Sequence, residues 1–159
     1  MVSGNTAGRL FGALFVGCVV LMFSGCAAST PPAADEYDQV NETLSNLERN
    51  YESENTEAFM KGVGRDYTLD YWALERSVNR ELDAYTGFDI DLYVDMVSVD
   101  SDTGMIFAET HWTKRRVSMN TGREFMINGE TIFIFRALPN GDLVLIGMKG
   151  NPLFGGDGW

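Results

Sequence analysis

The hydrophobic period of this chain changes once, near residue 86, and that change restricts the fold more than any other feature. From Asp35 to Tyr85, apolar residues recur every three or four positions, which predicts helices. From Phe88 onward they alternate with polar residues, which predicts strands. Three helices followed by four antiparallel strands in a meander predict an α+β fold whose helices cover one face of the sheet.

The three predicted helices differ in length and in the residues that begin them. The first carries one apolar stripe, made of Val40, Leu44, Leu47 and Tyr51. The second, TEAFMKGV, has Thr56 or Asn55 as its N-cap, because both side chains can accept from the first turn. The third begins at Asp70 and runs through Tyr85, with Gly87 placed where a helix C-terminus favours glycine.

The four predicted strands follow from alternation and turn residues. In FDIDLYVDMVSV, one face receives Ile90, Leu92, Val94 and Met96, and the solvent face receives Asp91, Tyr93 and Asp95. MIFAETHWTKRRVSM is a long strand, and REFMINGETIFIFRAL is another with an expected irregularity at Asn128–Gly129. PNGD predicts a hairpin turn that leads into LVLIGMKG.

The N-terminus has the pattern of a secretory signal, with Arg9 followed by the apolar run LFGALFVGCVVLMFSG. The ending Phe23-Ser24-Gly25-Cys26 resembles a bacterial lipobox, which implies cleavage before Cys26 and attachment of lipid to its sulfur. Residues 1–25 are then a lipoprotein signal peptide, 26–34 a flexible tether and 35–159 the folded domain. Attachment at Cys18 and an uncleaved anchor helix are the alternatives.

This interpretation places the protein in the cell envelope, held to the membrane through lipidated Cys26. Ala27 lacks the retention signal that Asp provides there in some Gram-negative bacteria, so an outer membrane facing the periplasm is expected. With Cys18 removed and Cys26 lipidated, no thiol remains for catalysis or metal binding. The formal net charge of −11 argues against a nucleic-acid partner.

The order of elements is similar to the cone-shaped fold of the nuclear transport factor 2-like superfamily, which includes polyketide cyclases and ketosteroid isomerases. The similarity rests on TLSNLERNYESENTEAFMKGVGRDY, on FAETHWTKRR and on TGREFMINGETIFIFRALPNGDLVLIGMKG, with an ending NPLFG like that of members without assigned chemistry. The resemblance implies three N-terminal helices packed on a curved antiparallel sheet of about four strands, with a pocket at the wide end of the cone. It also implies dimerisation through the sheet in many members. Because this fold serves many activities, function must come from the site.

His111 is the one histidine of the chain and the first candidate for acid–base chemistry. Strand alternation places it on the same face as Glu109, which could orient its imidazole. The opposite face of that strand is apolar, so an exposed or interface position for both is favoured over catalysis. No catalytic residue is assigned, and these two remain weak candidates.

An apolar pocket is the second candidate site, and an isomerase-like enzyme would need a carboxylate or His111 inside it. Its expected lining is aromatic: Trp72, Trp112, Phe133, Phe135, Tyr67 and Tyr71. The basic run Thr113-Lys114-Arg115-Arg116 is interpreted as a solvated strand end, with a patch for an acidic partner as the alternative. The acidic residues from Asp89 to Asp102 fit no calcium loop, and no metal or cofactor is expected.

Three functions follow in order of preference. The first is a non-catalytic, lipid-anchored envelope module that binds a partner or supports an assembly, with a homodimer through the sheet as one form. The second is a periplasmic binder of a small apolar ligand in the cone pocket. The third is an isomerase or dehydratase-like enzyme.

Overall fold

The computed structural model describes residues 34–156, as three helices followed by a four-stranded sheet. The predicted signal peptide, both cysteines and most of the predicted tether lie outside the described residues. The element order is the one that the change of hydrophobic period predicts, so the α+β class is confirmed. Among the described helices, none is both long enough and apolar enough to cross a membrane.

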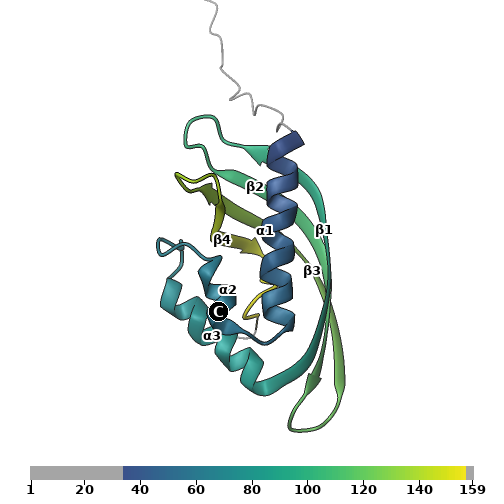
Figure 1. Ribbon diagram of the computed structural model, residues 1–159. Coiled ribbons are helices and arrows are strands. Elements are labelled where there is room, and N and C mark those ends of the chain that lie inside the picture. Colours follow the sequence, from purple (N-terminus) through teal and green to yellow (C-terminus); the bar gives the residue numbers. More distant parts are fainter. Residues whose placement is uncertain (1–33, 157–159) are drawn as a thin grey trace, which may run out of the picture.

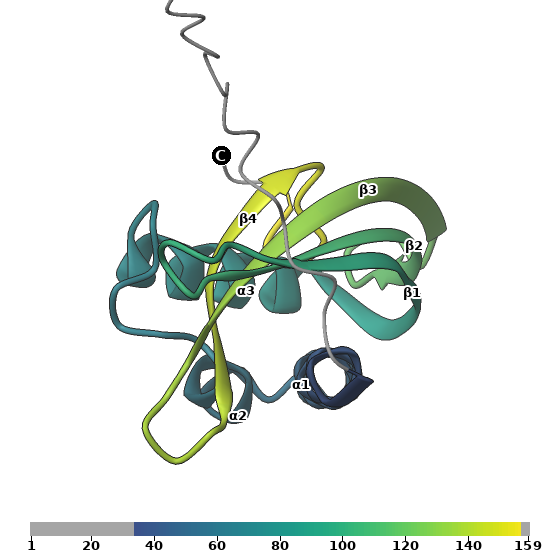
Figure 2. The same cartoon turned by 90° about the horizontal axis from the view of Figure 1, so that it is seen from above.

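The helices are α1 (Ala34–Glu52), α2 (Thr56–Lys61) and α3 (Tyr71–Ala84). Asn55 is the N-cap of α2, since its side-chain oxygen accepts from the backbone N–H of Ala58 at 3.0 Å. Asp70 caps α3 in the same way, accepting from the N–H of Trp72 at 2.9 Å. The predicted apolar stripe of α1 is buried along its whole length. Figure 2 shows α1 and α2 on the same side of the sheet.

The strands are β1 (Tyr85–Val99), β2 (Ile106–Ser118), β3 (Glu124–Ala137) and β4 (Leu143–Gly150). They lie in the order β1-β2-β3-β4 and pair antiparallel, so the sheet is the predicted meander. The sheet bends around α1 (Figure 1). Its inner face, toward the helices, carries Ala108 and Trp112 of β2, whereas its outer face carries the exposed Glu109 and His111.

The prediction of where the third helix ends was wrong. α3 ends at Ala84, and Tyr85 is already the first residue of β1. Gly87 lies inside the strand, with φ of 63°, where the pairing with β2 shifts between Thr86 and Asp89. A positive φ is easily adopted by glycine, and a strand irregularity needs it here. Gly87 therefore serves a bulge in β1 and not a helix terminus.

A second register shift in β1 corrects the predicted apolar face of that strand. It lies between Val94 and Met96, so the alternation changes phase there. Met96 is consequently 49% exposed, whereas Val97 is 4% exposed and faces the core. One extra residue reverses the faces of everything that follows it. Asp95 lies within this shift on the outer face.

The irregularity predicted at Asn128–Gly129 is not where β3 departs from ladder geometry. These residues pair with β2 in continuous register, and the shift lies between Ile134 and Phe135, opposite β4. Gly129 has another reason to be glycine. It lies across from Trp112, and an added Cβ would come within 2.6 Å of the indole ring. The missing side chain provides the space in which the indole packs.

Large side chains fill the interior of the cone. Tyr51 of α1 lies at its centre, with the ring of Phe88 at 5.3 Å and that of Phe154 at 5.0 Å. The fully buried aromatic residues are Tyr51, Phe59, Phe133, Phe135 and Phe154. Burial of each such ring contributes about 1.5–3 kcal/mol, and edge-to-face contacts add to it. The core is thus built largely by aromatic rings from both halves of the chain.

Candidate functional site

A charged cluster lies inside the cone, between α3 and the inner face of β2. The carboxylate of Glu81 accepts hydrogen bonds from Lys114 Nζ at 2.6 Å and from Arg116 Nη1 at 2.5 Å. These three residues are only 2%, 0% and 6% exposed, in that order. Buried ions are stable only when they are paired and hydrogen-bonded, as they are here. We call Glu81, Lys114 and Arg116 the buried charge cluster.

The buried charge cluster corrects the interpretation of the basic run on β2. Lys114 and Arg116 alternate with Arg115, so strand geometry sends them to the inner face and Arg115 to the outer face. Arg115 forms ion pairs there with Asp89 and Asp91, as a solvated strand end would. Lys114 and Arg116 are instead buried and paired with Glu81, so they do not form a surface patch for an acidic partner. Lys114 and Arg116 follow Trp112 at every second position of β2, and this spacing indicates that all three face the same side of the sheet.

The final described segment, Pro152–Gly156, passes through the interior of the cone; we call it the C-terminal segment. Leu153 and Phe154 are both 0% exposed. The ring of Phe154 lies 4.9 Å from that of Phe59 and 5.9 Å from that of Phe133. The segment therefore packs between the helices and the inner face of the sheet as part of the hydrophobic core.

Polar bonds hold the backbone of the C-terminal segment in place. Three of its backbone groups bond to Tyr51 or to the buried charge cluster: Leu153 O to Lys114 Nζ (2.6 Å), Gly155 N to Tyr51 Oη (3.1 Å) and Gly156 N to Glu81 Oε2 (3.0 Å). The hydroxyl of Ser77 on α3 donates to Gly155 O at 2.6 Å. Buried peptide groups require such partners. The charge cluster thus serves as the anchor of this segment.

The protonation states in the cluster follow from its surroundings. Burial alone would raise the pKa of Glu81, but Lys114, Tyr51 and Arg116 together hold that pKa below its ordinary value. Burial and the nearby Glu81 carboxylate raise the pKa of Tyr51 well above its usual range. At neutral pH, Glu81 is ionised and Tyr51 keeps its proton, which it donates to Glu81 at 2.5 Å. A carboxylate with these partners is a weak proton acceptor.

The residues expected to line an apolar pocket fall into two groups. Five of the six lie in the core: Trp112 (4% exposed), Phe133 (0%), Phe135 (0%), Tyr67 (5%) and Tyr71 (8%). Trp72 is 56% exposed on α3, and its ring touches that of Tyr71 edge-to-face, with centroids 5.3 Å apart. The indole N–H of Trp112 donates to Thr131 Oγ1 at 2.8 Å, so its polar edge is satisfied inside the fold. Burial raises the pKa of Tyr67 to about 12.

His111 lies on the outer face of the sheet, where it was expected, with a different partner. Its Nδ1 lies 2.8 Å from a carboxylate oxygen of Asp95, and its ring stacks on Tyr93 with centroids 5.1 Å apart. Both partners come from β1, where Tyr93 pairs directly with His111. Glu109 is exposed two residues away on β2 and lines a hollow of about 300 Å³ with Asp95. The sequence could not identify Asp95, because the contact depends on register.

The acidic residues of β1 and the following turn act as local partners. Asp89 and Asp91 pair with Arg115, and Asp100 accepts from the N–H groups of Asp102 and Thr103 at 2.9 and 3.2 Å. Within residues 34–156, no three His, Asp or Glu side chains converge as metal ligands would. Their arrangement is that of ordinary surface ion pairs and a capped turn.

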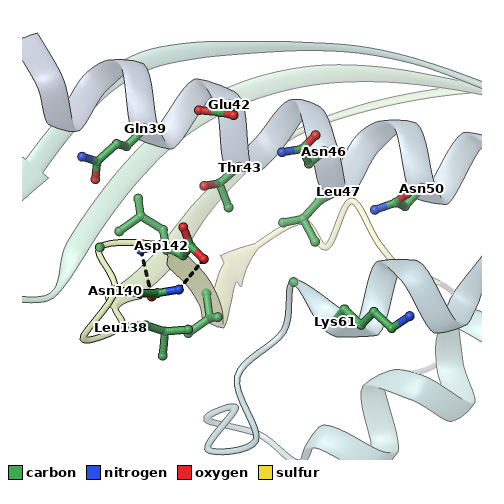
Figure 3. Close-up of a pocket in the computed structure, with 14 residues that line it drawn as sticks. Gln39, Glu42, Thr43, Asn46, Leu47, Asn50, Lys61, Leu138, Asn140 and Asp142 are labelled. Atoms are coloured by element: carbon green, nitrogen blue, oxygen red, sulfur yellow. Dashed lines mark hydrogen bonds between the residues drawn. The ribbon is translucent and has the colours of Figure 1, made fainter.

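A groove of about 560 Å³ lies outside the core, between α1 and the β3–β4 hairpin (Figure 3). Its lining combines apolar side chains with amides and carboxylates. Its apolar lining residues are Leu47, Leu138, Leu143 and Val144, and its polar ones include Gln39, Glu42, Asn46, Asn50, Asn140 and Asp142. The groove could not be predicted from local sequence patterns, because it forms between a helix and a hairpin about a hundred residues apart.

Comparison of the structure with solved structures identifies the fold. A conserved protein from Planctomyces limnophilus superposes with a TM-score of 0.65 at 9% identity, covering 74% of this chain and 99% of its own. A ketosteroid isomerase-like protein from Erwinia carotovora gives 0.63 at 12% identity, covering 73% and 95%. A protein of the nuclear transport factor 2-like superfamily from Salmonella enterica gives 0.57 at 10% identity, covering 77% and 96%. This chain has the nuclear transport factor 2-like fold.

The fold expected from the resemblance is therefore confirmed, with its α+β order and curved antiparallel sheet. No protein-family model and no curated protein matches the sequence. At these identities, the likeness concerns the fold alone, and function has to be argued from the residues.

Proposed function

We propose that this protein is a lipid-anchored, non-catalytic module of the cell envelope that binds a partner or supports an assembly. One observation carries the proposal: the C-terminal segment fills the interior of the cone. Leu153 and Phe154 are fully buried there, and the backbone of the segment is bonded to Lys114, Tyr51 and Glu81. A cone occupied by its own chain presents its surface, and not its interior, to other molecules.

The state of the buried charge cluster also supports this proposal. A catalytic carboxylate in an apolar pocket has a raised pKa and an open side toward substrate. Glu81 has a lowered pKa and is bonded to Lys114, Arg116 and Tyr51. These are the properties of a structural ion network.

The outer face of the sheet is the surface we propose for a homodimer. It carries exposed apolar side chains at Tyr93 (58% exposed), Met96 (49%) and Met126 (71%). Between them lie Asp95 and His111, whose contact orders this part of the surface. Aromatic residues and methionine are enriched where protein surfaces meet.

Native mass spectrometry of residues 27–159, sprayed from a non-denaturing buffer, tests the proposal. We expect a ligand-free protein with a population of dimer that decreases on dilution. Met126→Glu should abolish that dimer, whereas Arg123→Glu, a charge change on the nearby turn, should preserve it. A bound small molecule that copurifies in stoichiometric amount would overturn the proposal in favour of a ligand-binding cone.

A further inference from the structure

The free edge of β4 is partly covered by the chain itself. Residues 62–64, just after α2, run beside it as a short parallel segment. The N–H of Leu145 donates to Gly62 O, and the N–H of Gly64 donates to Leu145 O, both at 2.9 Å. This edge of the sheet therefore already pairs with an extended chain at one position.

The same edge is open two residues earlier, at Leu143. Leu143 lies opposite Ala137, and at the neighbouring position the N–H of Leu138 donates to Asp142 O. Hydrogen-bonded and non-hydrogen-bonded pairs alternate along an antiparallel ladder, so Leu143 and Ala137 form a non-hydrogen-bonded pair. The N–H and C=O of Leu143 consequently point away from β3, in the direction of the Leu145 groups. Among the described residues, the covering chain leaves the edge at Gly62, whose N–H donates to Phe59 O at the end of α2.

The groove between α1 and the hairpin lies at this open position. Leu143 and Val144 line it on the hairpin side and α1 lines it on the other, and Figure 3 shows Thr43 of α1 facing Asp142 of the hairpin. A volume of about 560 Å³ is within the range of specific binding sites. The amide side chains that line it can both donate to and accept from peptide groups.

The charge of the groove indicates the kind of peptide. Glu42 and Asp142 supply carboxylates to it, while its lysine, Lys61, is paired with Glu57 at 3.1 Å. The chain as a whole carries a formal charge of −11. A basic side chain on the occupant complements these carboxylates, and an acidic one is repelled.

We propose that this groove binds an extended peptide segment bearing a basic side chain, which adds to the sheet at Leu143. The peptide backbone accepts from the Leu143 N–H and donates to the Leu143 C=O, while one apolar side chain contacts Leu138 and Val144. This is strand addition at an edge, in which the backbone supplies affinity and the groove supplies selectivity. The inference rests on the proposed function, since it names a partner class for a surface of the module.

Selection from a random-peptide library displayed on phage tests the inference. We expect enrichment of sequences with Lys or Arg beside β-branched residues. The strongest enriched peptide should shift the amide resonance of Leu143 and slow its hydrogen exchange. N-methyl groups at alternate peptide bonds can be placed in two ways, which gives two analogues that keep every side chain. One of the two should bind at least about tenfold more weakly, because it lacks the N–H group that donates to Leu143.

Two variants of α1 control for the place of binding. Thr43→Trp fills the groove and should weaken binding by about tenfold or more, whereas Ser45→Trp, on the exposed side of the same helix, should leave binding unchanged. No enrichment, enrichment of acidic sequences, or binding that Thr43→Trp and N-methylation leave intact would each overturn the inference. If the peptide experiments fail in one of these ways while native mass spectrometry still shows a ligand-free dimer, the peptide-binding inference is wrong and the proposed function is unaffected.

Discussion

The ammonium group of Lys114 donates a hydrogen bond to the carbonyl oxygen of Leu153 at 2.6 Å, across 39 positions of sequence. This bond joins the middle of the sheet to the C-terminal segment in a place that water does not reach. Since the same ammonium also binds Glu81, the segment and the charge cluster depend on each other. Changing either of them should therefore affect the stability of the whole domain.

Phe154→Ala should destabilise the domain by about 3–5 kcal/mol, because it removes a fully buried ring from an aromatic cluster. Urea unfolding followed by circular dichroism measures this loss. Trp72→Ala, which truncates an aromatic ring that is 56% exposed, is the matched control and should cost far less. Equal losses for the two variants would mean that the C-terminal segment is not part of the cooperative core.

Glu81→Gln should destabilise the domain by about 3–5 kcal/mol at neutral pH, because it leaves Lys114 and Arg116 buried without their carboxylate. The folded-state pKa of Glu81 is lowered, so its contribution is present above the ordinary glutamate pKa and is lost as pH falls through the lowered value. Unfolding curves at neutral and acidic pH should therefore converge for variant and wild type as the pH falls.

The exposed Asp83→Asn on the same helix supplies the control for this change of charge. It should shift stability by less than about 0.5 kcal/mol at either pH. A Glu81→Gln protein as stable as this control would show that the cluster is dispensable for folding.

The large features of the fold could be predicted because they depend on periodicity. The stripe Val40, Leu44, Leu47 and Tyr51 needs only a helix of the predicted length to become buried, and the faces of β2 need only alternation. The details that could not be predicted depend on register. Asp95 meets His111 because two particular strands pair in one register, and a shift beside Asp95 turns Met96 outward.

The buried charge cluster shows a different limit of sequence reasoning. A run of cations in an acidic protein is usually solvated, and composition therefore favoured the surface for Lys114 and Arg116. Their alternation with Arg115 indicates that they face the interior. Their burial is stable only because Glu81 on α3 lies where it can pair with both. That pairing joins residues more than thirty positions apart, and no local pattern reports it.

Glu48→Gln should stabilise the domain above neutral pH. Burial and the nearby Glu52, Asp91 and Asp89 raise the pKa of Glu48 to about 7. A raised folded-state pKa favours folding below the ordinary glutamate pKa, and this advantage is lost as pH rises toward 7. After discounting for solvent screening at this half-exposed site, we expect about 1 kcal/mol between the two limits.

Thermal unfolding between about pH 5 and about pH 8 measures the effect of Glu48. The variant should lose less stability than the wild type over this interval. Glu42→Gln, an exposed change on the same helix, should follow the wild-type profile. Parallel profiles for wild type and Glu48→Gln would contradict the raised pKa.

The proposed lipid anchor gives the last prediction. Cys26→Ser should abolish incorporation of labelled palmitate into the full chain expressed in a bacterium, and should move the protein from the membrane to the soluble fraction, because the acyl chains supply its membrane affinity. Cys18→Ser should remain labelled and membrane-bound, since Cys18 lies within the segment proposed to be removed. Loss of label in Cys18→Ser alone would transfer the attachment site to Cys18. Membrane retention of an unlabelled Cys26→Ser protein would instead indicate an uncleaved N-terminal anchor.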